Sequence, residues 1–285
     1  MSATAGAIQR PKWIDAIPRW VGAAVLTAGL TGAILLTAQL TKNWTIVPAA
    51  MFIGAMTGPL VFLVWLDGRT RIGRSVAPDV LFIVWLVGGG VAMIFVGIFE
   101  SDYLYHARFV GYVWYSAIEA TAKLLVPIAI CTVLPKYRTL EHALALALVS
   151  AAGFATMESL SYAISAYDES VQAVRSSLIE RSLITPFGHL PWTTMAVIVA
   201  VRAWQKRGRI TLSPKALWGF GLAITLHATW NAAVVERGWW HLLVIPTAVI
   251  TFAVMYHLVS GVYYDGPYVI PKDYAAQHHH DRHGR

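Results

Sequence analysis

The stretch VLFIVWLVGGGVAMIFVGIF, from Val80 to Phe99, contains 20 consecutive residues without a charge. An α-helix rises about 1.5 Å per residue, so a run of this length crosses the roughly 30 Å of hydrocarbon in a bilayer. Comparable apolar runs recur along the whole chain, which is 57% hydrophobic and only 13% charged. Such a composition is far too apolar for a soluble globular domain. The sequence therefore predicts an all-α, polytopic membrane protein.

We expect eight transmembrane helices, joined by short connections that make neighbouring helices antiparallel. The predicted ranges are 18–41, 46–66, 79–99, 109–134, 140–166, 183–204, 214–235 and 239–262. The first apolar stretch is too long for a cleavable signal peptide, so it is interpreted as a retained anchor. The chain then divides into a cytoplasmic segment (1–17), one transmembrane domain (18–262, with a motif-bearing core at about 110–235) and a polar cytoplasmic tail (263–285).

The net charge of +7 has to be considered against membrane topology before any acidic partner is proposed. With eight spans and the N-terminus inside, 16 of the 22 lysines and arginines fall on the cytoplasmic side. Both termini are therefore predicted to be cytoplasmic, in a multi-pass protein of the cell membrane with no nucleic-acid partner. Cys131 is the only cysteine, which excludes an intrachain disulfide and a CxxC-type metal site.

Several polar side chains interrupt the predicted spans, where an ionisable group near the bilayer centre costs about 2.5–3.5 kcal/mol. They are Glu119 and Lys123 in the fourth span, Glu158 in the fifth, His189 in the sixth, and His227 with Asn231 in the seventh. Residues four apart share one helix face, so each such pair forms a polar stripe. Counting along the helices from their predicted outer ends places these residues roughly 6–15 Å deep. A shared depth on four helices favours one buried site that opens toward the outer face.

Each of these residues also has a structural interpretation when it is taken alone. Glu119 and Lys123 could be an ion pair that only locks helix packing, and Glu158 could be a protonated hydrogen-bond donor. His227 and Asn231 could hydrogen-bond across helices, which is worth about 1 kcal/mol. Because Glu119, Glu158, His189, His227 and Asn231 share a similar depth, five separate structural explanations are less plausible than one common site.

Two carboxylates, two imidazoles, an amide and a lysine suit hydrolysis of an amide or ester. A glutamate can act as general base on water, while histidines bind a metal or donate hydrogen bonds to an oxyanion. A glutamate mechanism without metal uses the same residues, and the sequence leaves both open. A serine nucleophile is disfavoured because no GxSxG elbow is present.

Four motifs occur in order along the chain: IEATAK (118–123), GFATMESLSY (153–162), RSLITPFGH (181–189) and LHATWN (226–231). With them the chain resembles the PrsW-type intramembrane proteases, a family distantly similar to the CAAX-prenyl endopeptidases and their bacterial relatives. The resemblance implies a bacterial peptidase that acts on a membrane-anchored protein, with anti-sigma factors as the family's best-known substrates. The chain departs from the family motifs at Ala120, where a second glutamate is usual, and at Ser159, where an asparagine is usual.

The resemblance also implies roles for the intramembrane polar residues. Glu119 would activate water, and Lys123 would set its charge state. His227 and Asn231 would polarise the scissile carbonyl or hold the oxyanion. Glu158 and His189 would complete the site, and if zinc is the cofactor, its ligands would be Glu158, His189 and His227, with an open fourth position. The depth of these residues further predicts a cut near the extracytoplasmic end of the substrate's span.

Two other functions remain open from the residues. One is a membrane metallohydrolase that acts on lipid amides, which would share glutamate and histidine in the outer leaflet. The other is a transporter or scaffold without enzymatic activity, in which Glu119, Lys123 and Glu158 form an ion path.

Overall fold

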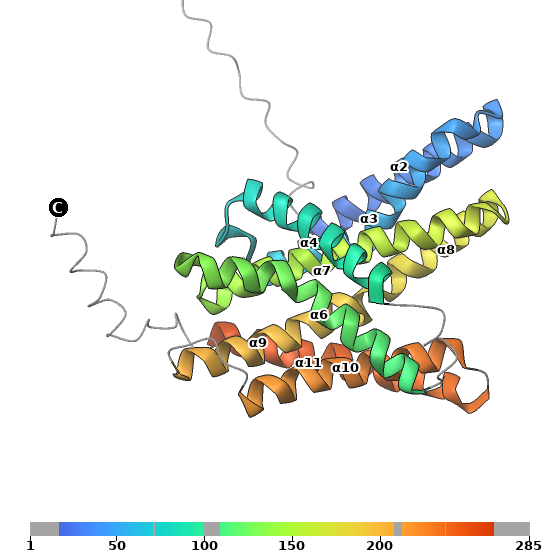
Figure 1. The fold of residues 1–285 in the computed structure, drawn as a ribbon. Coiled ribbons are helices and arrows are strands. Elements are labelled where there is room, and N and C mark those ends of the chain that lie inside the picture. The colour runs from blue at the N-terminus through green and yellow to red at the C-terminus, as the bar shows by residue number, and fades with distance from the viewer. Residues whose placement is uncertain (1–16, 71, 100–108, 208–212, 237, 265–285) are drawn as a thin grey trace, which may run out of the picture.

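The computed structural model describes residues 17–70, 72–99, 109–207, 213–236 and 238–264 (Figure 1). Within these ranges every regular element is an α-helix or a short 3-10 helix, so the predicted all-α membrane class is confirmed. The predicted cytoplasmic segment 1–17 and polar tail 263–285 lie almost entirely outside the described residues. Their placement therefore stays a prediction.

In the described part of the chain, eight long helices correspond to the predicted ranges, because the apolar runs end at polar residues, glycine or proline. They are α2 (Arg19–Thr41), α3 (Val47–Thr70), α4 (Pro78–Phe99), α6 (Phe109–Val133), α7 (Leu140–Tyr167), α9 (His189–Arg207), α10 (Pro214–Val235) and α11 (Val244–Tyr264). The helices predicted at 183–204 and 239–262 begin later than expected, at His189 and Val244, because a short 3-10 helix precedes each of them. A shorter helix, α8 (Val171–Ile184), lies between α7 and α9. The connecting 3-10 helices are η1 (Trp44–Ile46), η2 (Ile72–Arg74), η3 (Pro135–Tyr137), η4 (Thr185–Phe187) and η5 (Gly238–Leu243).

Seven segments of the described chain, rather than the predicted eight, are long and apolar enough to cross a membrane. Helices α8 and α9 together form one of them, Val171–Trp204. Helix α10 has the length, at 22 residues, but is not among the seven. His227 and Asn231 lower its hydropathy, since imidazole and amide groups are strongly hydrophilic. Helix α10, which is too polar to count as a membrane span, is thus a helix that carries predicted site residues.

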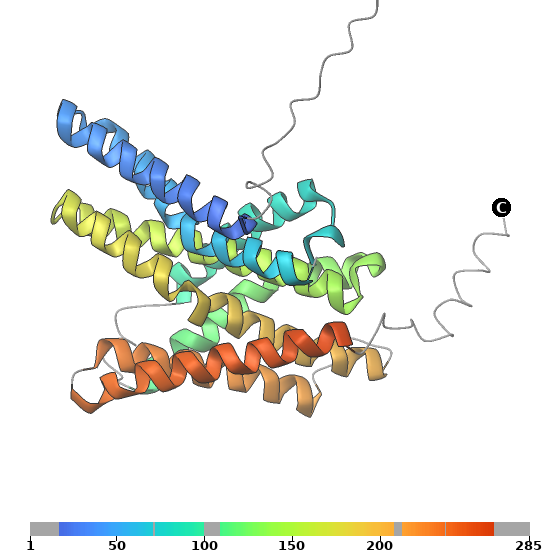
Figure 2. The ribbon, with the colours of Figure 1, turned by 180° about the vertical axis from the view of Figure 1, so that it is seen from behind.

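Helix α7 is the centre of the bundle. In its most apolar window 78% of the residues are buried, against 22% for α2 and for α4. It packs against α3, α4, α6, α8 and α9. Helices α9, α10 and α11 form a second group on one side, visible in both views (Figures 1 and 2). Helix α6 crosses between the groups and contacts α4, α7 and α10.

Helices α4 and α7 approach each other closely at two glycines. A Cβ atom at Gly153 would lie 2.0 Å from the carbonyl oxygen of Trp85, and one at Gly89 would lie 2.5 Å from the backbone of Gly153. Small residues permit this approach, and close packing is a main source of helix association in membranes. Because Glu158 lies less than two turns beyond Gly153, this crossing fixes the position of the α7 part of the site.

Helix α8 packs against the bundle through one apolar face. It begins at Ser170, whose side chain accepts a hydrogen bond from the backbone N–H of Ala173. Val174 and Leu178 are buried in a cluster with α3 and α7 residues instead of facing the membrane surface. The packing of this apolar face directs Arg181, one turn further along α8, toward α7.

Candidate active site

Helix α6 contributes a buried ion pair. The Lys123 Nζ lies 3.1 Å from Glu119 Oε2, one helical turn away, and the two side chains are 1% and 9% exposed. The ammonium also lies 4.5 Å from the centre of the Phe154 ring, a cation–π contact. Lys123 is therefore held by an anion and by an aromatic face, with almost no access to solvent or lipid.

Pro127 interrupts the backbone hydrogen bonding of α6 one turn after Lys123. Pro127 has no N–H, so the carbonyl of Lys123 loses its normal helical partner. The hydroxyl of Ser150 on α7 donates to that carbonyl at 2.8 Å instead. The substitute hydrogen bond ties α6 to α7 at the residue that carries the ammonium.

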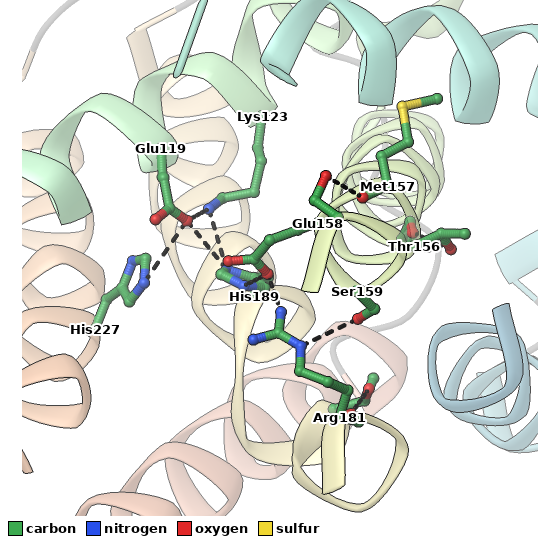
Figure 3. Close-up of polar contacts among 12 residues, drawn as sticks. Glu119, Lys123, Thr156, Met157, Glu158, Ser159, Arg181, His189 and His227 are labelled. Carbon is green, nitrogen blue, oxygen red and sulfur yellow. Dashed lines mark hydrogen bonds and ion pairs between the residues drawn. The ribbon is translucent and has the colours of Figure 1, made fainter. Parts of the chain in front are cut away.

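His189 is the first residue of α9 and bridges the two glutamates. Its Nδ1 lies 3.2 Å from Lys123 Nζ and 3.5 Å from Glu119 Oε2, and its Nε2 lies 2.8 Å from Glu158 Oε2 (Figure 3). An ammonium can only donate, so Nδ1 is the acceptor in this arrangement. The ring proton is then on Nε2, where it is donated to Glu158. The hydrogen-bond network thereby assigns the tautomer of His189.

His227 enters the site from α10. Its Nε2 lies 3.7 Å from Glu119 Oε2, and its side chain is 3% exposed. The ring stacks on Trp192 with a centroid distance of 4.2 Å, and it meets His189 edge-on at 5.2 Å. The Trp192 indole N–H in turn donates to Thr251 of α11 at 3.2 Å. Trp192 therefore fixes the imidazole plane without contacting the carboxylate.

Glu158 is held from below by Arg181 of α8. The Arg181 guanidinium hydrogen-bonds and ion-pairs with Glu158 Oε2, and its Nε donates to Ser159 Oγ at 3.2 Å (Figure 3). The same guanidinium lies 4.4 Å from the centre of the Tyr162 ring. Arg181 thus contacts three residues of α7, and the carboxylate of Glu158 interacts with both Arg181 and His189.

Three side chains in the described part of the chain could hold a metal ion together. Ligand atoms of Glu119, His189 and His227 all lie within 4.8 Å of one another. The predicted ligand set named Glu158 in place of Glu119. The structure instead places the Glu158 carboxylate against Arg181 and against the far nitrogen of His189. A carboxylate hydrogen-bonded to the second nitrogen of a histidine is the usual outer partner of a metal-binding histidine.

The sequence-predicted residues therefore separate into two groups. The structure joins Glu119, Lys123, Glu158, His189 and His227 in one contact network. Asn231 is half-buried one turn from His227 and makes no hydrogen bond to another described residue. Its assignment to the site remains a prediction.

Some residues that shape the site were not among the predicted site residues. Arg181 belongs to a motif noted in the sequence, but spacing alone gave no partner for it. Pro127 did carry a usable signal, because a proline within a span frees the carbonyl four residues earlier, here that of Lys123. A hydroxyl or amide donor from another helix could have been expected there.

The site joins glutamate, lysine and histidine side chains of α6, α7, α9 and α10, and a buried set of these groups is typical of a hydrolase embedded in the membrane. The sequence model of the PrsW family of intramembrane metalloproteases matches residues 76–259, a wider range than that of the four motifs. The chain belongs to this family, as its motifs indicated, and is a multi-pass intramembrane protease. Comparisons with curated proteins and with solved structures gave no match.

Proposed function

We propose that the chain hydrolyses a peptide bond of a membrane-anchored protein, with Glu119 as the general base that takes a proton from water. The observation that carries the proposal is the position of Glu119 Oε2. Lys123 Nζ, His189 Nδ1 and His227 Nε2 lie 3.1, 3.5 and 3.7 Å from it, on three helices. A structural ion pair needs only one of these three partners, so their convergence supports a reactive carboxylate.

The neighbouring groups have complementary tasks in this mechanism. The Lys123 ammonium stabilises the negative charge of Glu119 before the proton arrives. Proton uptake by a positioned carboxylate typically accelerates hydrolysis by about 10²–10⁴-fold. His227 and Asn231 lie one turn apart on α10, and their donors would face the carbonyl oxygen of the scissile bond. Removing one oxyanion donor from such a site costs about 10²–10³-fold in rate.

The donor set also fits the metal that the family description implies. One carboxylate and two imidazoles within 4.8 Å are the ligands of a catalytic zinc site with an open position. Glu119, His189 and His227 would hold the ion, which would lower the pKa of a bound water. Lys123 Nζ lies 3.1 and 3.2 Å from two of these ligand atoms, so its side chain would have to turn away. Glu158 would then keep the His189 ring in place through Nε2.

The metal is tested by elemental analysis of purified protein. A metal-dependent site is expected to contain about one zinc per chain, to lose it in His227→Ala, and to retain it with weakened affinity in Glu158→Gln. The outer-partner role of Glu158 predicts a 10–100-fold loss of affinity in that variant. Active protein with no bound metal would establish the metal-free glutamate mechanism with the same residues.

For the substrate, we propose a single-span protein of the anti-sigma-factor type in a bacterial cell membrane. This follows from the family resemblance. We further propose that both termini of the enzyme are cytoplasmic and that the bond cut lies near the extracytoplasmic end of the substrate's span. The excess of lysine and arginine on the predicted inner side supports this orientation.

The proposal is tested in cells that carry Glu119→Gln, with Glu141→Gln as the matched control. Glu141 is an exposed residue in the first turn of α7, away from the site. We expect certain membrane-protein fragments to disappear with Glu119→Gln and to persist with Glu141→Gln. Fragments that persist in both would refute peptide hydrolysis, and new termini mapped to the cytoplasmic side would refute the proposed orientation. Fatty-acid release from lipid amides by purified protein would instead favour the lipid hydrolase.

A further inference from the structure

An apolar groove runs along the surface between α6 and α9. It has a cavity volume of about 40 Å³ and is lined by one stripe of α6, from Leu124 to Cys131, by one stripe of α9, from Ala196 to Trp204, and by Ala143 of α7. Ile128 on its edge is 39% exposed, and Ala200 is half-buried. The groove is therefore open to the surroundings of α6 along part of its length, where lipid or another chain can enter.

A second, smaller cavity lies between this groove and the proposed active site. It has a volume of about 10 Å³, and its lining includes Lys123 and His227. Leu124 and Ala196 line both cavities. The two spaces are therefore neighbours, separated by one pair of side chains, and the inner one borders Lys123 and His227.

The lining determines what can occupy each space. Every residue of the groove is apolar, so a hydrocarbon side chain gains by entering and a charged one loses its solvation. The inner cavity is bordered by three alanines on three helices, Ala120, Ala196 and Ala223. Its volume is that of about one water molecule. Ala120 stands where the family motif has a second glutamate, so here that wall of the cavity is apolar.

We propose that this α6/α9 groove binds the apolar segment of the protein substrate that follows the scissile bond toward the η3 end of the bundle. The inner cavity admits a small side chain beside that bond. From Leu124 to Cys131 the groove is about 10 Å long, which matches about three residues of extended chain. The inference rests on the proposed peptidase function, because the occupant must continue into the site where its bond is cut.

The occupant is tested by photocrosslinking in a Glu119→Gln background. The substrate is first identified as a membrane protein whose fragments disappear in Glu119→Gln cells. A benzophenone amino acid is then placed at position 200 in the groove, or at position 129, an exposed position of α6 that lines neither cavity. We expect the substrate to be crosslinked from position 200 and not from position 129. Crosslinks to lipid only at position 200, or equal capture at both positions, would overturn the proposal.

A second pair of variants measures the effect on cleavage. Ala200→Trp fills the groove, and Ala129→Trp adds the same side chain on the outside of α6. Loss of one buried apolar contact of the substrate, about 1.5–3 kcal/mol, corresponds to a roughly 10–100-fold lower rate of cleavage for Ala200→Trp. Ala129→Trp is expected to cleave normally. Normal cleavage by a folded Ala200→Trp protein would refute the groove assignment while leaving the role of Glu119 intact, whereas unchanged fragments in Glu119→Gln cells would refute the peptidase itself.

Discussion

Replacing Lys123 by methionine should destabilise the bundle strongly, since it leaves the buried carboxylate of Glu119 without its cation. The Lys123 Nζ and Glu119 Oε2 lie 3.1 Å apart, and the side chains are only 1% and 9% exposed. At an effective dielectric constant of about 20, a pair at this distance attracts with about 5 kcal/mol. Breaking a buried pair by removing one partner typically costs about 3–5 kcal/mol. We expect Lys123→Met to lose about 3 kcal/mol or more.

The matched variant removes both charges. In the double variant Glu119→Gln with Lys123→Met, no uncompensated charge is left, and replacing a buried pair by neutral groups is often neutral in stability. Its free energy of unfolding should therefore lie well above that of Lys123→Met, although cleavage should be lost in both. Lys136→Met serves as a surface control, because Lys136 is exposed in η3.

The measurement is the free energy of unfolding of purified protein in mixed micelles, titrated with SDS and followed by circular dichroism or tryptophan fluorescence. Reversibility is established first by refolding from SDS. The reasoning is refuted if Lys123→Met unfolds with the free energy of wild type, or if the double variant is as unstable as the single one. Either result would mean that Glu119 is not paired with Lys123 in the folded protein.

Three further outcomes test packing and positioning. Gly153→Ala should lower the free energy of unfolding by about 1–3 kcal/mol, because its Cβ would meet a helix backbone at 2.0 Å. Its control is Gly90→Ala, which should be neutral or stabilising in the same SDS titration, because nothing lies within 4 Å of its Cβ. Ser150→Ala should cost about 1–3 kcal/mol, since it leaves the carbonyl of Lys123 without its donor, and an unchanged transition would show that another group replaces it. Arg181→Leu should reduce substrate cleavage at least tenfold, because it releases the Glu158 carboxylate that orients the His189 ring. Full cleavage by this variant would show that Arg181 does not position Glu158 for the reaction.

The sequence by itself determined the elements of this fold. Apolar runs of about 20 residues have few stable alternatives to a helix in a bilayer, because every backbone polar group must be satisfied internally. The predicted range 214–235 coincides with α10, and 140–166 differs from α7 by one residue. Periodicity and depth also indicated which polar residues would meet, since their helix faces and levels follow from counting residues.

The tertiary structure decided how those residues are connected. The sequence predicted Glu158 as a metal ligand; in the structure its carboxylate contacts Arg181 and the Nε2 of His189, while ligand atoms of Glu119, His189 and His227 lie within 4.8 Å of one another. The contact between Arg181 and Glu158 depends on where α8 packs, which is set by the burial of Val174 and Leu178 against other helices. The α6/α9 groove is likewise a product of how two helices are spaced. Helix length and polarity are local properties of a sequence, whereas side-chain partners depend on the crossing of helices that are distant in the chain.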